Sequence, residues 1–433
     1  MGRDWPALSL RDAGVELIDC DHRTPPAAEN GYPYVAIPQL RGGRIDLSDA
    51  RRITPNDFRE WTRKAKPAPY DVVLSRRCNP GETAFVQPGL EFALGQNLVL
   101  LRADGTKVYP PFLRWLVSAP DWWDQIAKFL NVGAVFDSLK CADVPKFTLR
   151  IPPLPEQRAI ADILGTLDDK IELNRKMSET LEAMARALFK SWFVDFDPVR
   201  AKAEGRDPGL PKHLAELFPA YLVDSEQGEI PDGWRVDALA DMATLNPEAW
   251  QKETRPAEIR YVDLSSTKWG RIETVAVHQQ ADAPSRAQRV LRPGDTIIGT
   301  VRPGNGSYAF ISEEGLTGST GFAVLRPKRA QYAEVVYLAA TARANIEALS
   351  HVSDGGAYPA VRPEVVAATR VVRPIDRVLD RFSQVTKTLL HKMSDNERES
   401  RTLASLRDEL LPKLTSGQLR VSVATRIVRA EAC

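Results

Sequence analysis

The sequence predicts an α+β protein in which two similar α/β modules are separated by two long antiparallel helices that form a coiled coil. Two observations predict this fold. The 433-residue chain repeats itself, because the segment from residue 160 matches the segment from residue 382 without a gap. Both segments carry apolar residues at alternating steps of three and four, which is typical of a coiled-coil seam. A duplicated unit of about half the chain implies two similar binding events.

The repeat also extends into the regions that precede the helices. Matched pairs there are Trp5 with Trp234, Tyr34 with Tyr261, Ala84 with Ala309 and Leu101 with Leu325. The spacing within these pairs falls steadily toward the constant spacing of the helices, as small deletions in loops would produce. Short apolar runs between Gly- and Pro-rich stretches indicate strands and loops in both modules.

These patterns divide the chain into six segments. The first module covers residues 1–154 and its helix 155–193. A proline-rich connector covers 194–232, and the second module covers 233–374 and its helix 375–416. A tail covers 417–433, and we expect the part after Leu419 to be frayed.

Each predicted helix has about 40 residues and would be about 60 Å long. The first seam consists of apolar residues at positions 160, 163, 164, 167, 171, 177, 181, 184, 188 and 192. The second consists of Leu379, Phe382, Val385, Leu389, Met393, Leu403, Leu406, Leu410 and Leu414. Antiparallel pairing of the two helices is the simplest way to bury both seams.

One polar residue interrupts each seam near its middle. Antiparallel pairing would place Asn174 beside Asn396. A buried asparagine costs stability but fixes the register of paired helices, so we predict a register role for both. The alternative is that each asparagine faces solvent on a locally twisted helix.

Composition excludes several classes of protein. The net charge of +1 argues against a protein that coats nucleic acid by bulk charge, although it permits a local contact face. The four cysteines are widely spaced and the histidines form no metal-binding motif, so we expect neither a disulfide framework nor a bound metal. No apolar run is long enough for a membrane span, which favours a soluble cytoplasmic protein.

Signatures of catalysis are mostly missing. The stretch from Gly294 to Thr300 has the glycine spacing of a phosphate-binding loop but lacks its lysine. The tetrapeptide with which an adenine methyltransferase would hold its target base is also missing. We therefore predict no catalytic residues and no cofactor in this chain.

Polar loops in equivalent places of the two modules are the strongest candidates for binding. The first module has Arg76, Arg77 and Asn79 after a strand, and the second has Arg302 and Asn305. Arginine pairs well with guanine and asparagine with adenine in the major groove of DNA. The alternative is a solvated hairpin, but the recurrence in both modules favours a function.

A second pair of loops carries an aromatic residue and ends on a basic one. These loops, 133–140 and 356–362, contribute Lys140 in the first module and Tyr358 and Arg362 in the second. Such residues suit contacts with a phosphate or a base step. An aromatic residue that fills the core of its own module is an equally good explanation.

Three segments make the chain resemble the specificity subunit of a type I restriction–modification system. They are Pro152–Gln157 with the helix that follows, Leu188–Phe193 with Asp195–Pro198, and Gly228–Trp234. The architecture matches over nearly the whole chain. The entry to the second helix departs from the family pattern, because Arg373–Asp376 replaces a proline-rich segment that ends in Glu-Gln.

The resemblance implies two target-recognition domains that each read one half of a bipartite, asymmetric site in double-stranded DNA. The paired helices would set the distance between them. It also implies two kinds of partner. Two methyltransferase subunits would bind S-adenosylmethionine, and restriction motor subunits would use ATP and Mg²⁺. Chemistry would then belong to the partners.

Two other functions remain open at this stage. One is an enzyme whose nuclease or methyltransferase site has no recognisable motif. The other is a coiled-coil scaffold whose modules bind peptides rather than DNA. The salt dependence of DNA binding separates the scaffold from the specificity subunit, since phosphate contacts make binding weaken with added salt.

Overall fold

The computed structural model describes residues 5–133, 136–251, 253–353 and 359–431. The chain divides into two compact units, residues 1–169 with 403–433 and residues 170–402. Each long helix contributes one part to each unit. The six segment boundaries proposed above therefore stay a prediction, because the units divide the helices rather than the connectors.

The first unit contains a four-stranded antiparallel sheet in the order β2-β10-β7-β8 and a three-stranded sheet in the order β6-β3-β9. Their bounds are β2 Val15–Asp19, β10 Leu98–Ala103, β7 Val72–Ser75, β8 Thr83–Phe85, β6 Arg51–Ile53, β3 Tyr32–Val35 and β9 Ala93–Leu94. Two further pairs are β1 (Ala7–Ser9) with β11 (Thr148–Arg150), and the hairpin β4 (Leu40–Arg41) with β5 (Arg44–Ile45). The short helices are α1 Pro55–Trp61, α2 Leu113–Leu116 and α3 Pro120–Phe129.

The second unit repeats this arrangement. Its antiparallel sheet has the order β15-β24-β21-β22, with bounds Ala243–Leu245, Phe322–Pro327, Thr296–Gly299 and Tyr308–Phe310. Its other sheet is β19-β16-β23-β20, with bounds Ala276–Gln279, Glu258–Val262, Leu316–Ser319 and Ala287–Val290. The hairpin β17 (Thr267–Lys268) with β18 (Arg271–Ile272) and the pair β14 (Arg235–Ala238) with β25 (Arg370–Arg373) match their counterparts in the first unit. The helices are α7 Leu239–Met242, α8 Ala333–Ala340, α9 Arg343–Val352 and α10 Pro363–Ala367.

The central strands have an obvious origin in the sequence. Residues of β7 and β21 are buried throughout, and both strands read as short continuous apolar runs. Such runs are typical of strands that are covered on both faces. The proline-rich connector that follows α4 in sequence forms two short helices and a hairpin. These are α5 (Asp197–Ala203), α6 (Lys212–Ala215) and the hairpin of β12 (Leu222–Ser225) with β13 (Gly228–Pro231).

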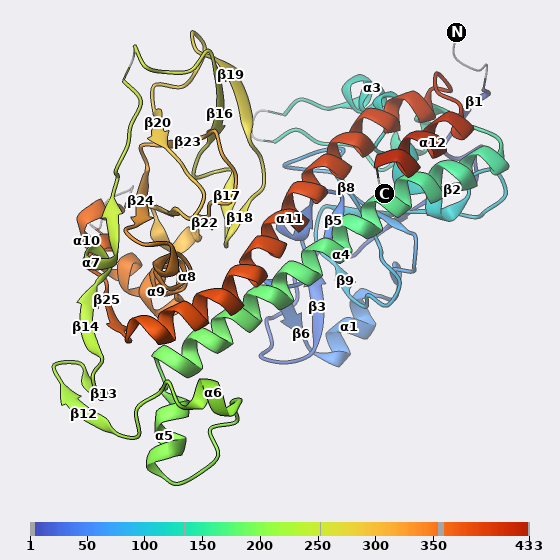
Figure 1. Cartoon of the computed structure of the whole chain (residues 1–433). Coiled ribbons are helices and arrows are strands. Elements are labelled where there is room, and N and C mark those ends of the chain that lie inside the picture. Colours follow the sequence, from blue (N-terminus) through green and yellow to red (C-terminus); the bar gives the residue numbers. More distant parts are fainter. Residues whose placement is uncertain (1–4, 134–135, 252, 354–358, 432–433) are drawn as a thin grey trace. The chain divides into compact units, whose positions relative to one another are not determined.

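The two long helices are α4, Leu154–Phe193, and α11, Asp376–Thr415, and they pack together as predicted (Figure 1). In the first unit, Asp168 of α4 contacts Arg407 of α11. In the second unit, Phe189 and Phe193 of α4 pack on Phe382 of α11. The first half of α4 therefore contacts the last part of α11, and the end of α4 contacts the start of α11. The two helices are antiparallel, and the predicted coiled coil and fold class are confirmed.

Three predicted seam residues prove to be exposed, namely Met177, Met184 and Val385. Their places in the contact are taken by the next residues along each helix, Ser178, Ala185 and Thr386, which are buried. The prediction chose the large apolar residue in each case. The helices instead approach each other through smaller side chains, and the hydroxyl of Thr386 is satisfied by the Phe382 carbonyl at 2.8 Å.

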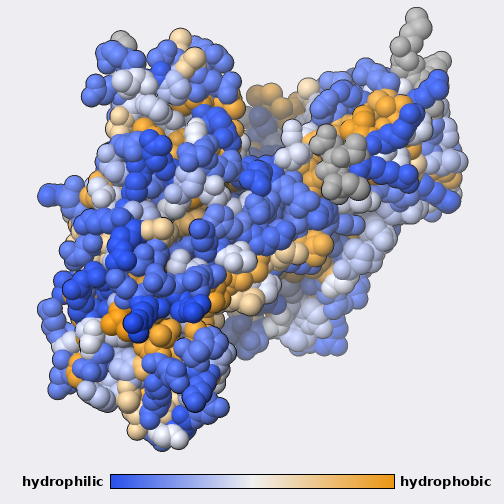
Figure 2. Space-filling model, viewed as in Figure 1, coloured by the Kyte–Doolittle hydropathy of each residue, from blue (hydrophilic) through white to orange (hydrophobic). Residues whose placement is uncertain are grey.

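Because Met177 and Met184 are exposed, α4 has an apolar strip on its outer face. Leu173, Met177 and Met184 are 53%, 37% and 53% exposed, and partly buried Leu181 and Leu188 continue the strip toward the core. Figure 2 shows apolar surface along this part of α4. The spacing of three and four residues places all five on one face.

The tail does not fray as expected. Val421–Glu431 forms the helix α12, in which Ala424 and Val428 are buried. Apolar residues at helical spacing give it a face to bury, which the prediction overlooked. Within the described residues, no helix combines the length and the apolar character that crossing a membrane requires.

Candidate nucleic-acid interface

The structure joins the two predicted loops of the first unit. Arg77, in the loop between β7 and β8, forms an isolated bridge with Ser138. The Leu139 N–H donates to the Arg76 carbonyl at 2.9 Å. The loop at 76–79 and the segment that ends at Lys140 are therefore neighbours, although the sequence indicated them separately.

The same joint recurs in the second unit. Val301 forms a bridge with Ala360, and the Val361 N–H donates to the Thr300 carbonyl at 2.9 Å. The Arg302 N–H donates to the Pro359 carbonyl at 2.7 Å. Of the residues predicted here, Tyr358 lies outside the described residues.

Left-handed backbone positions shape both loops. In the first unit Cys78 has a φ of 66°, and in the second Arg302 has a φ of 48°. Residues other than glycine adopt this conformation at a cost, which is commonly met at functional sites. Arg302 is followed directly by the 3-10 turn Pro303–Asn305.

Most of the predicted side chains point to solvent. Exposed members are Arg77, Asn79, Lys140, Arg302, Asn305 and Arg362. Asn79 donates to Glu82 at 3.1 Å. Each unit therefore presents two exposed basic side chains and one exposed asparagine near its pair of joined loops, a combination that suits phosphates and base edges.

Arg76 differs from the other predicted residues because it is half-buried. Its Nη1 donates to the Leu139 carbonyl at 3.4 Å, and its Nε is buried without a hydrogen-bond partner. Arg76 therefore connects the two loops of its unit, and this position suits a residue that holds the loops rather than one that reads a base.

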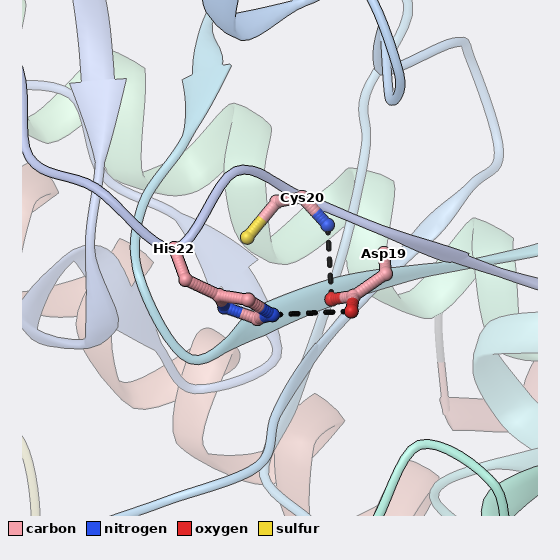
Figure 3. A group of neighbouring side chains, drawn as sticks. All are labelled: Asp19, Cys20 and His22. Carbon is pink, nitrogen blue, oxygen red and sulfur yellow. Dashed lines mark hydrogen bonds and ion pairs between the residues drawn. The ribbon is translucent and has the colours of Figure 1, made fainter.

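A small polar cluster at the end of β2 was missed by the sequence reasoning. The ligand-type atoms of Asp19, Cys20 and His22 lie within 4.8 Å of one another (Figure 3). His22 Nε2 lies 3.1 Å from Asp19 Oδ2, and Cys20 Sγ donates to the Gly95 carbonyl at 3.2 Å. The signal in the sequence was the local spacing of the three residues.

The chemistry of this cluster does not favour a metal. Cys20 Sγ is buried and uses its proton in the hydrogen bond to the Gly95 carbonyl, and burial raises the pKa of this thiol to about 11, so the cluster is fully accounted for by its own hydrogen bonds. The expectation of no bound metal in this chain stays a prediction.

The two predicted register residues lie against one another in the second unit. Asn174 Nδ2 is 3.4 Å from the Asn396 carbonyl and donates to Glu399 at 2.8 Å. Asn396 Nδ2 lies 3.3 Å from the hydroxyl of Ser178. Both asparagines are buried. The side-chain amide of each hydrogen-bonds to groups on the opposite helix, but the two side-chain amides do not bond to each other.

Comparisons with known proteins agree with this geometry. Residues 22–183 match the model of the type I restriction modification DNA specificity domain. The HindI specificity subunit of Haemophilus influenzae is 25% identical, over 90% of this chain and 95% of that protein. The MjaIX specificity subunit of Methanocaldococcus jannaschii is 22% identical, over 97% of this chain and 94% of that protein. Over nearly its whole length the chain is similar to the specificity subunits of type I restriction–modification systems.

A solved structure shares the fold of this chain. The S subunit of a type I restriction–modification system from M. genitalium aligns with a TM-score of 0.55 at 15% identity, over 95% of this chain and 96% of that one. Specificity subunits direct DNA recognition and are the non-catalytic members of their systems. These relatives therefore favour a specificity subunit over the catalytic enzyme that the sequence left open.

Proposed function

We propose that this chain reads a bipartite, asymmetric site in double-stranded DNA, with one half read by the joined loops of each unit. The observation that carries the proposal is the recurrence of the same loop joint, Arg77 with Ser138 and Val301 with Ala360. Two copies of one recognition scaffold with different side chains would read two different half-sites.

The proposed contacts divide into two kinds. The exposed arginines and lysine of the loops would contact phosphates or guanine, and Asn79 and Asn305 would contact adenine. Arg76 would hold the loops of its unit in place. With a net charge of +1, the chain would depend on partner surfaces for further contacts along the duplex.

The proposal includes partners that perform the chemistry. Two adenine methyltransferase subunits would supply S-adenosylmethionine, and restriction motor subunits would supply ATP and Mg²⁺. This chain would need no cofactor of its own, and the complex would act on DNA in the cytoplasm.

The apolar strip of α4 is our proposed contact for a methyltransferase subunit. Leu173, Met177 and Met184 expose apolar side chains at helical spacing, which is how one helix presents itself to another. Methionine adapts its shape to a partner surface more readily than branched residues do.

The recognition proposal is tested by mapping the preferred site on random DNA with the assembled complex. We expect two short half-sites of different sequence, separated by a gap that has no base preference. The substitution Asn305→Ala should relax the base preference in one half-site only. Asn79→Ala should relax the base preference in the other half-site. A single continuous palindrome would contradict the proposal.

The partner contact is tested by co-purification with the cognate methyltransferase subunit. Met184→Glu places a charge in the strip and should release the subunit, while the second unit keeps its fold. The matched control is Val277→Glu on β19, because Val277 is similarly exposed at 58% and lies outside the strip. Retention of the subunit by both variants would exclude this surface.

A further inference from the structure

The hairpin β17–β18 carries a tryptophan in an unfavourable position. Its two turn residues, Trp269 and Gly270, have φ values of 47° and 85°. A two-residue turn with both φ values positive suits a hairpin, but favours glycine and asparagine. Trp269 therefore adopts a strained backbone, which costs about 1–2 kcal/mol.

The equivalent hairpin of the first unit shows that the fold does not need this tryptophan. The turn between β4 and β5 consists of Gly42 and Gly43, with φ values of 56° and 77°. The same turn is thus built twice, once with the favoured residue and once with tryptophan. The repeat gives a reference within one chain.

The tryptophan is also poorly buried. Its side chain is 52% exposed, so about half of a large apolar surface remains in water. In the free chain the ring makes an edge-on contact with Tyr308, at 6.0 Å between ring centroids, and the exposed half of the indole has no packing partner among the described residues.

Trp269 is held directly against a predicted DNA-reading loop. The backbone N–H of Trp269 donates to the Gly306 carbonyl at 2.6 Å. A Cβ on Gly306 would lie 2.5 Å from the indole ring, so the ring passes over this glycine. Between Arg302 and Gly306 lies the turn that carries Asn305.

The indole also forms one wall of a cavity of about 520 Å³ in the second unit. Arg186, Tyr308, Arg343 and His351 are among the other lining residues. Aromatic and basic side chains around an open cavity suit a nucleobase and its phosphate.

We propose that Trp269 is a DNA-contacting residue of the second unit, whose indole stacks against a base at the edge of the half-site that the 302–306 loop reads. The inference rests on the proposed function and adds a contact that the first unit, with Gly42, lacks. Binding of DNA would bury the exposed indole and so offset its strain. Exposed aromatic side chains at nucleic-acid-binding surfaces stack on bases in this way.

The test compares Trp269→Phe with Trp269→Leu in the assembled complex on its own DNA site. Both variants keep a large apolar residue on the same strained backbone, but only phenylalanine can stack. We expect Trp269→Leu to weaken binding about tenfold, with Trp269→Phe close to the wild type. The slope of log affinity against log salt should be the same for all three, because no phosphate contact is lost.

A second readout follows base stacking directly. A fluorescent 2-aminopurine placed at successive positions beside the half-site should be quenched most at the position on which the indole stacks, and Trp269→Leu should remove this quenching. The matched control is Tyr70→Leu, because Tyr70 is also an exposed aromatic residue at positive φ. Its side chain is 41% exposed and its φ is 70°. Tyr70 precedes β7, whereas the 76–79 loop follows it. Tyr70→Leu should leave affinity and fluorescence unchanged.

Each result decides the inference. Equal affinity and equal fluorescence in Trp269→Leu and the wild type would overturn it, as would the same loss in Tyr70→Leu. A wild-type complex that reads no split site would instead overturn the proposed function, so the two failures are distinguishable.

Discussion

At the scale of single residues, the clearest feature is one carboxylate that serves three arginines in the first unit. Asp168 is 8% exposed and lies 2.7 Å from Arg407, 3.1 Å from Arg114 and 3.8 Å from Arg44. Burial lowers the pKa of Arg114 to about 10, and the nearby Asp168 carboxylate opposes this shift. The cluster connects α4 and α11 to the first sheet domain.

We expect Asp168→Asn to lower the free energy of unfolding by about 3 kcal/mol, because Arg114, which is only 16% exposed, loses its ion-pair partner. Urea unfolding measures the change. Asp408→Asn is the matched control, since Asp408 pairs with the same Arg407 but is 64% exposed, and should cost below about 1 kcal/mol. Equal losses in the two variants would contradict a special role for burial.

Glu397 on α11 provides a prediction of pH dependence. Burial raises the pKa of Glu397 from 4.5 to about 7, despite the nearby Arg401 and Arg271. Because the folded pKa lies above the unfolded one, its favourable contribution is complete below about pH 4.5 and is lost as the pH rises to 7.

Glu397→Gln removes this titration. The variant and the wild type should be similarly stable near pH 4, and the variant should be more stable by roughly 3 kcal/mol above about pH 8. Urea unfolding at both pH values checks this. A variant that is less stable at the higher pH would show that the arginines need the carboxylate.

At the scale of elements, the helix pair combines an apolar contact with one polar layer. Asn174, Ser178, Asn396 and Glu399 make hydrogen bonds across α4 and α11, and Lys170 adds an ion pair with Glu399 at 3.3 Å. A layer of this kind stabilises one register, since any slip leaves buried amides unsatisfied.

Replacing Asn174 and Asn396 together by leucine should raise the stability of the helix pair and loosen its register. A bifunctional thiol crosslink between Lys170→Cys and Glu399→Cys, which spans the length of the two removed side chains, reports the register, because Lys170 Nζ lies 3.3 Å from a Glu399 carboxylate oxygen. We expect its yield to fall in the double variant and the off-register pair Lys170→Cys with Asp395→Cys to gain. An unchanged yield would exclude the register role.

At the scale of the whole molecule, the proposed function makes the helix pair a spacer between two reading domains. Seven residues inserted after Asp169 and seven after Thr402 would lengthen both helices by about 10 Å, which equals about three base pairs. We expect a longer gap and unchanged half-sites when the preferred site is mapped. Altered half-site sequences would contradict the spacer model.

The sequence by itself determined the duplication, the two long helices and the loops that recur after equivalent strands. These depend on local periodicity and on a repeat that any reader can align. It also indicated Asn174 and Asn396, since polar residues in an apolar seam are visible without coordinates.

Only the tertiary structure decided how the contacts are made. It joined the two loops of each unit, turned Arg76 inward, and placed Ser178 and Ala185 in the helix contact where large apolar residues had been expected. It also revealed the strained Trp269 beside Gly306. The physical reason is that the exact rotation of a helix and the meeting of distant loops depend on packing between residues far apart in the chain, which local patterns do not specify.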